Sequence, residues 1–166
     1  MITVDEGLHL FLVGIGATVV MDIGSVIQRA MKMPTLDYAL VGRWAGHICR
    51  GQWSHNSIAK APAIMGESVT GWGIHYFTGV LFAALLLAIE GTEWLRTPTL
   101  LPAVIVSALT VLVPFFVMQP AMGAGIAASR TPSPWVNRLR SLLNHAIFGL
   151  GLYLSAILTR WLGLFN

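Results

Sequence analysis

Four long apolar stretches, separated by more polar segments, set the pattern of this chain. They cover about residues 8–28, 69–89, 100–118 and 142–163, and each has roughly the 20 mostly apolar residues that a helix needs to cross the hydrocarbon core of a bilayer. The alternation of polar and apolar positions that marks a membrane β-strand is absent from them. The pattern therefore predicts an all-α integral membrane protein, in which residues 1–166 form a single domain built as a four-helix bundle.

A shorter amphipathic helix is predicted over about residues 36–50, with Thr35 as its N-cap. Cationic side chains recur on one of its faces at i, i+4 and i+7, in the order Arg43, His47 and Arg50. Such a helix is expected to lie at the inner leaflet, where its cations contact anionic lipid headgroups. The alternative is that these side chains and Arg130 bind an anionic ligand.

Composition and charge support a membrane rather than a nucleic-acid partner. Hydrophobic residues make up 55% and charged residues 10% of the chain, whereas an average soluble domain has about 25% charged residues. The net charge is +3, but the basic residues do not form the dense stripe that binds phosphate backbones. Most of them lie between the first and second stretches or between the third and fourth. Because cytoplasmic segments carry the excess of Lys and Arg, both termini are predicted to be non-cytoplasmic.

The two halves of the chain share an order of short motifs. Each half has a Val-Met-Asp/Gln run, then an arginine, then Pro-Thr/Ser, then His-x-x-x-Gly, and the two sets end in His75 to Gly79 and His145 to Gly149. Duplication predicts two tandem helical hairpins related by a pseudo-twofold axis along the membrane normal. Chance similarity in apolar sequence is the other interpretation.

Polar residues in or beside the predicted spans are the candidate site, because ionisable groups in a bilayer need partners. The repeat would bring them together: Asp22, His75, Gln119 and His145, with Asn144 beside the last. One hypothesis is a proton or ion path through these residues. A second is a cofactor, either a metal ion held by Asp22, His75 and His145 or a haem between the two histidines. The third is interhelical hydrogen bonding that holds the bundle together.

Two further features bear on function. Pro114 and Pro120 are expected to bend or interrupt the third helix, beside a segment rich in small residues.

Walker, nucleophile-elbow and dinucleotide signatures are absent. Glu67 could act as a general acid or base near His75, but an enzyme is the less favoured interpretation.

Several runs of sequence resemble a bacterial family of small inner-membrane proteins that is catalogued as a domain of unknown function. The resemblance covers most of the chain and rests on these runs: Ile15 to Asp22, Leu36 to Trp44, Pro114 to Pro120, Met122 to Pro132 and Arg140 to His145. It implies a multi-pass protein of the bacterial inner membrane and supplies no activity, cofactor or catalytic residue.

Taken together, the residues favour a small transport or permeation protein, or an accessory membrane subunit, with an intramembrane polar centre. A metal- or haem-binding redox subunit and a structural or scaffolding subunit are the alternatives. Membrane lipids are the expected partners, together with further copies of the chain or other subunits, because four thin spans enclose little volume.

Overall fold

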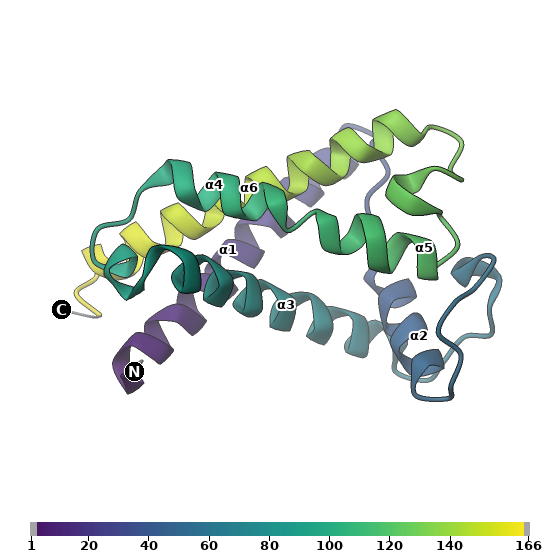
Figure 1. Cartoon of the computed structure of the whole chain (residues 1–166), viewed down its shortest axis with the longest axis horizontal. Coiled ribbons are helices and arrows are strands. Elements are labelled where there is room, and N and C mark those ends of the chain that lie inside the picture. The colour runs from purple at the N-terminus through teal and green to yellow at the C-terminus, as the bar shows by residue number, and fades with distance from the viewer. Residues whose placement is uncertain (1–2, 165–166) are drawn as a thin grey trace. The chain divides into compact units, whose positions relative to one another are not determined.

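The computed structural model describes residues 3–164, and all the regular secondary structure in that range is helical. Figure 1 shows the helices in chain order, with these bounds: α1 Val4–Ala30, α2 Tyr38–Ile48, η1 Ile58–Lys60, α3 Glu67–Glu90, η2 Thr92–Leu95, α4 Leu100–Leu109, η3 Pro114–Met118, α5 Gln119–Ala121, η4 Ile126–Ala128 and α6 Pro134–Trp161. Four helical stretches are long and apolar enough to cross a membrane: Val4–Ala30, Glu67–Glu90, Leu100–Ala121 and Pro134–Trp161. The predicted all-α fold with four membrane-length helices is confirmed.

Side-chain caps determine where the first two helices begin. Thr3 and Glu6 form a reciprocal capping box that starts α1 at Val4, and this satisfies backbone N–H groups that a helix start leaves unpaired. The predicted N-cap Thr35 is wrong for α2. Asp37 caps it instead, because its carboxylate accepts a hydrogen bond from the backbone N–H of Ala39 at 3.0 Å.

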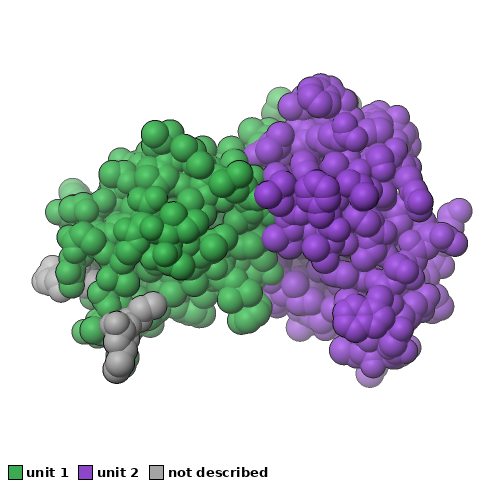
Figure 2. All heavy atoms as spheres, in the orientation of Figure 1, with its two compact units in different colours: residues 1–34, 76–110, 143–166 green, residues 35–75, 111–142 purple. Residues whose placement is uncertain are grey.

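The chain divides into two compact units, coloured separately in Figure 2. Unit 1 comprises residues 1–34, 76–110 and 143–166, and unit 2 comprises residues 35–75 and 111–142. The division falls within α3 and within α6. Each unit is described by itself below.

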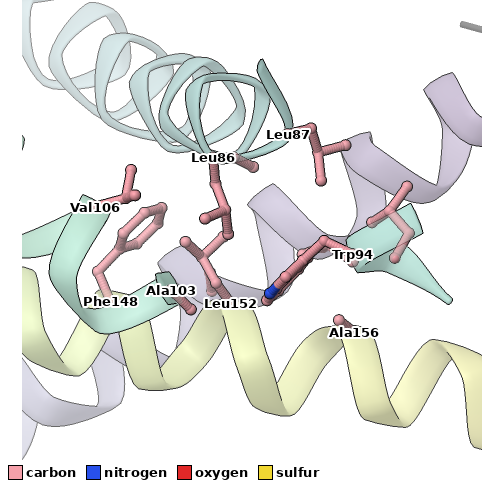
Figure 3. Close-up of a cluster of buried hydrophobic side chains, with 12 residues drawn as sticks. Leu86, Leu87, Trp94, Ala103, Val106, Phe148, Leu152 and Ala156 are labelled. Atoms are coloured by element: carbon pink, nitrogen blue, oxygen red, sulfur yellow. The ribbon is translucent and has the colours of Figure 1, made fainter. Parts of the chain in front are cut away.

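Unit 1 is a four-helix bundle with an apolar core. The core takes side chains from α1, α3, η2, α4 and α6, and Figure 3 shows Leu86 of α3 above Leu152 of α6, with the Phe148 ring beside Val106 of α4. Trp94 of η2 is also buried and donates its indole N–H to the carbonyl of Thr99 at 3.2 Å. The connector between α3 and α4 is therefore anchored in the bundle.

Glycines let the helices of unit 1 approach closely. A methyl group at Gly14 of α1 would lie 2.7 Å from the Cα atom of Val80 in α3, and one at Gly149 of α6 would lie 2.7 Å from the Cα atom of Val104 in α4. A methyl group at Gly151 would lie 2.8 Å from the carbonyl oxygen of Ala17. Small residues at helix contacts are typical of membrane bundles, where close backbone packing replaces the hydrophobic effect between helices.

Unit 2 joins α2 and the first turns of α3 to the segment that follows α4. Gly42 of α2 faces Gly71 of α3, and a methyl group on Gly42 would lie 2.6 Å from the backbone nitrogen of Gly71. The two helices thus cross nearly backbone to backbone. The segment from residue 111 to 128 contains a π-helix that begins at Pro114. Proline lacks the N–H that would continue an α-helix, so an interruption follows at the predicted place.

Candidate functional site

Asp22 lies well inside the first membrane-length helix, whereas the other two acids of α1, Asp5 and Glu6, are in its first turn. The carboxylate of Asp22 has a partner on α3. The hydroxyl of Tyr76 donates a hydrogen bond to Asp22 Oδ2 at 2.9 Å. Both side chains are half-buried in unit 1. Asp22 lies about 12 Å of helical rise before the end of α1, at 1.5 Å per residue. This carboxylate is therefore held by a neighbouring helix while part of its surface stays exposed.

A second polar pair in unit 1 joins Gln28 of α1 to Asn144 of α6. The Gln28 amide donates to Asn144 Oδ1 at 2.6 Å, and Gln28 is buried. Asn144 was singled out from the sequence and Gln28 was not, although Gln28 is the last residue of the predicted first span. The pair cross-links the two helices and satisfies two amides at once.

His145 has a defined tautomer, because all its neighbours at Nδ1 are hydrogen-bond acceptors. The Thr110 hydroxyl donates to the carbonyl of Ser107 at 2.6 Å, so its oxygen accepts from His145 Nδ1 at 2.7 Å. The Ser107 carbonyl also lies 3.2 Å from Nδ1 and can only accept. The proton of the neutral ring is therefore on Nδ1, and Nε2 carries the lone pair. Donation of one ring N–H to a backbone carbonyl is also the usual arrangement of a metal-ligating histidine.

His9 forms a comparable contact that sequence reasoning missed. Its Nε2 atom lies 2.7 Å from the hydroxyl oxygen of Thr159, and both side chains are buried in unit 1. Because that hydroxyl donates to the carbonyls of Ser155 and Ala156, it accepts from His9. The signal in the sequence was a lone histidine near the start of the first span, 150 positions from its partner.

His75 and Gln119, the other two members of the predicted centre, belong to unit 2. The His75 ring stacks on Tyr38 with centroids 4.0 Å apart and meets the edge of Trp72 at 5.7 Å. Gln119 Oε1 is buried and has no hydrogen-bond partner among the described residues. The proposed meeting of all these residues in one centre stays a prediction, as does the internal repeat.

The predicted metal set of Asp22, His75 and His145 has no support from the structure. Among residues 3–164, no group of three or more His, Cys, Asp or Glu side chains is placed to hold a metal ion.

Arg43 of α2 joins α3 to the loop between them. Its guanidinium donates to both carboxylate oxygens of Glu67, at 2.8 and 2.7 Å. Its Nη1 atom also lies within 3.1–3.4 Å of three loop carbonyls, those of Ile58, Ala59 and Ala61. The hydrogen bonds to Glu67 raise the pKa of Arg43 above its usual value. A bidentate pair of this kind fixes direction as well as distance.

The other polar side chains of α2 hold the same loop. His47 is buried; its Nε2 donates to the carbonyl of Pro62 at 2.9 Å, and its Nδ1 lies 3.0 Å from Gln52 Oε1. The Trp44 indole N–H donates to the carbonyl of Trp53 at 2.9 Å. Arg43 and His47, predicted as contacts for lipid headgroups or an anion, thus bond within unit 2, whereas Arg50 and Arg130 are exposed.

The loop is also bonded to the end of α5, near which it lies in Figure 1. The backbone N–H groups of His55 and Ile58 donate to the carbonyls of Ala121 and Met122, at 2.8 and 3.0 Å. Gly123 has φ of +96°, and a methyl group there would lie 2.5 Å from the carbonyl carbon of Asn56. We call residues 52–62 the pinned loop, because side chains and backbone hold it on two sides.

A cavity of about 470 Å³ is lined by the pinned loop, by Pro120 of α5 and by Arg130. Its lining includes two cations, Lys60 and Arg130, and no carboxylate. The amides of Gln52 and Asn56 and two serines add polar groups. His55 also lines it, and both of its ring nitrogens are shielded from solvent without a hydrogen-bond partner among residues 3–164. We call this cavity the loop pocket.

Comparison with known proteins gives a family and no activity. The family described as "Protein of unknown function (DUF2938)" matches residues 11–159. No curated protein and no solved structure matches the chain.

Proposed function

The chain belongs to the DUF2938 family, and we propose that it is a small transport or permeation protein of the bacterial inner membrane. The observation that carries the proposal is the half-buried carboxylate of Asp22, held by Tyr76 inside a membrane-length helix. Ionisable groups at such depth mark solute, ion or proton paths in membrane proteins. In this proposal both termini lie outside the cytoplasm, because eight of the ten Lys and Arg residues fall within residues 29–60 or 130–140, and only Arg96 and Arg160 fall elsewhere.

The position of Asp22 in α1 would place its charged carboxylate within the hydrocarbon layer, where an unsolvated charge is unfavourable. Helix α1 has 27 residues, which gives a length of about 40 Å against a hydrocarbon core of about 30 Å. If α1 is centred in the bilayer, Asp22 lies roughly 7 Å inside the hydrocarbon edge. A carboxylate there is destabilised by several kcal/mol unless it is solvated or bonded. The Tyr76 hydroxyl offsets part of that cost.

Solute uptake into proteoliposomes tests the proposal. Purified protein is reconstituted and screened with labelled inorganic anions, carboxylates and amino acids, against liposomes without protein. We expect saturable uptake of at least one solute. Asp22→Asn should reduce that uptake about ten-fold or more, since a hydrogen bond or ion pair to a charged group contributes about 1.5–3 kcal/mol.

Two further variants show whether a loss of uptake in Asp22→Asn is specific to that carboxylate. Glu90→Gln is the matched control, because Glu90 is an exposed carboxylate at the end of α3, and its uptake should equal wild type. Tyr76→Phe removes the hydroxyl alone and should lower uptake less than Asp22→Asn does. Uptake that is absent for every solute, or unchanged in a stably folded Asp22→Asn protein, would refute transport.

A structural role is the second candidate, and the contacts of the other predicted residues favour it. Asn144 bonds to Gln28 and His145 bonds to Thr110, each across two helices of unit 1. If holding the bundle is their whole role, Asn144→Ala and His145→Ala lower thermal stability and leave the uptake per folded molecule unchanged.

The cofactor hypothesis draws on the tautomer of His145. A ring that donates through Nδ1 presents Nε2 as a ligand atom. The hypothesis requires a Soret band or stoichiometric metal in gently purified protein, and that signal must disappear in His145→Ala.

A further inference from the structure

We infer that the loop pocket binds the phosphate group of a small phosphorylated molecule. This inference deepens the proposed transport function, on which it rests, by naming the chemistry of the solute. It concerns residues of unit 2 alone, so it can be tested by binding without any flux.

The charge of the lining favours an anion. Lys60 and Arg130 come from different segments, one at the end of η1 and the other just after η4. No Asp or Glu lines the pocket. The contrast is a cavity of about 650 Å³ in unit 1, which is lined by both acids and arginines, among them Asp5, Glu6 and Arg160. The loop pocket therefore has a single sign of charge, which attracts and orients an anion.

The number and kind of donors favour phosphate over a carboxylate. Arginine can bind two oxygens of one anion through its planar fork, and lysine supplies a compact second charge. The Gln52 and Asn56 amides and the two serine hydroxyls offer further donors around the same space. A phosphate group, with its three or four oxygens, accepts more hydrogen bonds than a carboxylate does. The cavity of about 470 Å³ also leaves room for an organic group beside the phosphate.

His55 lines the loop pocket but adds no donor to it. Its ring nitrogens are shielded from solvent, and none of the residues 3–164 bonds to them. Because solvent in the open cavity does not reach these nitrogens, a ligand there does not reach them either. The donors of the pocket are therefore the two cations, the two amides and the two serines.

The walls of the pocket are already in place. Arg43, His47 and Trp44 hold the pinned loop from α2, and backbone bonds to Ala121 and Met122 hold its other side. A loop fixed by this many bonds need not lose further freedom on binding, which favours affinity for a small ligand.

Two sources could present the same phosphate chemistry: a free solute or the headgroup of an anionic lipid. Full-length protein in neutral detergent micelles is titrated with inorganic phosphate and with glycerol 3-phosphate by calorimetry. In a second arm, binding is measured to vesicles of phosphatidylglycerol and to vesicles of phosphatidylcholine.

Three variants identify the site. Lys60→Gln and Arg130→Gln should each weaken phosphate binding about ten-fold or more, because each removes a charge-assisted hydrogen bond. Arg50→Gln is the matched control, since Arg50 is an exposed arginine of unit 2 outside the pocket, and binding should change less than about two-fold. Thermal unfolding of each variant reports whether it is folded.

Each outcome decides something. Binding of the soluble phosphates that depends on Lys60 and Arg130 supports a solute, and the same dependence with phosphatidylglycerol vesicles alone supports a lipid headgroup in the pocket. If wild type binds neither, or if Arg50→Gln weakens binding as much as the pocket variants do, the inference is overturned. Asp22→Asn should keep wild-type phosphate binding, so a failure of transport leaves the pocket standing. If Lys60→Gln and Arg130→Gln change neither uptake nor binding, the pocket is not the phosphate site. The transport proposal then stands, provided that the protein takes up a solute.

Discussion

Replacing Gly71 by alanine should loosen the crossing of α2 and α3, on which unit 2 depends. The added methyl group would overlap the carbonyl oxygen of Tyr38 and lie 2.6 Å from its carbonyl carbon. Real Cβ atoms essentially never come within 3.0 Å of such atoms. The backbones must therefore separate, by about 0.4 Å on the carbon distance alone (from 2.6 to 3.0 Å) and by more to clear the oxygen. No flexible side chain is available to give way instead.

The expected size follows from the cost of overpacking. Forcing extra atoms into a filled contact destabilises by about 1–3 kcal/mol, occasionally more. For chains of about 150–250 residues, 1 kcal/mol corresponds to roughly 2–4 °C in Tm, so Gly71→Ala should lower Tm by roughly 2–12 °C. Tryptophan fluorescence on heating in detergent can follow the change, because Trp44, Trp53 and Trp72 belong to unit 2. Scan rates must be matched, since heating of membrane proteins is often irreversible.

Gly73→Ala is the control on the same helix. A methyl group there meets nothing within 4 Å, and alanine favours a helix over glycine by about 0.5–1 kcal/mol. Its Tm should equal or exceed that of wild type. Gly42→Ala should resemble Gly71→Ala, and the double variant should cost less than the sum, because both methyl groups open the same crossing. A Gly71→Ala protein as stable as Gly73→Ala would refute the close backbone packing.

Three further predictions concern the pinned loop and His145. Arg43→Lys keeps the charge but cannot reproduce the bidentate pair with Glu67 and the bonds to three carbonyls. Hydrogen exchange measured by mass spectrometry should therefore rise over residues 52–62 and stay unchanged over residues 76–90. Exchange over residues 52–62 that equals that of wild type would contradict the pinning role. Gly123→Ala should weaken phosphate binding and lower Tm, because its methyl group would overlap the backbone of Asn56. Gly51 is also at positive φ but has nothing within 4 Å, so Gly51→Ala should lower Tm less and keep phosphate binding. A larger loss of Tm or of binding in Gly51→Ala than in Gly123→Ala would count against the loop contact. Thr110→Val removes the hydroxyl that accepts from His145 and should destabilise the folded state by about 1–3 kcal/mol in chemical unfolding. Thr97→Val is the control and should cost less, because the Thr97 hydroxyl is exposed and its bond to the carbonyl of Glu93 is long, at 3.3 Å.

The fold was predictable because its signal is long and uniform. The membrane-length helices have 22 to 28 residues, most of them apolar, and a few misjudged positions do not hide such a run. Helix ends were harder to predict. Thr35 and Asp37 are both good N-caps, and the choice depends on which side chain reaches a free N–H, as Asp37 does for Ala39. The two prolines predicted a break in the third helix, but the π-helical form of that break depends on local backbone geometry.

The candidate site was less accessible to sequence reasoning, because most of its partners are distant or belong to the backbone. Asp22 stood out as an acid in an apolar run, whereas its partner Tyr76 had no distinguishing pattern. The face of Arg43 and His47 was recognised, but its main acceptors are Glu67 and the carbonyls of a loop, which carry no sequence signature. The loop pocket could not be predicted, since Lys60 and Arg130 are 70 positions apart and join only through folding. Of the four residues predicted as anion contacts (Arg43, His47, Arg50 and Arg130), only Arg130 lines the pocket.

The glycine contacts of unit 1 bear on how quickly a solute could cross. Where Gly14 meets Val80 and Gly149 meets Val104, a single added carbon would collide with backbone, so no open pore runs along these seams. A crossing step through this unit would require helices to separate and close again, and motions of that kind take microseconds to milliseconds. Turnover would then resemble that of a carrier, saturating with concentration and rising steeply with temperature, in contrast to diffusion through a channel.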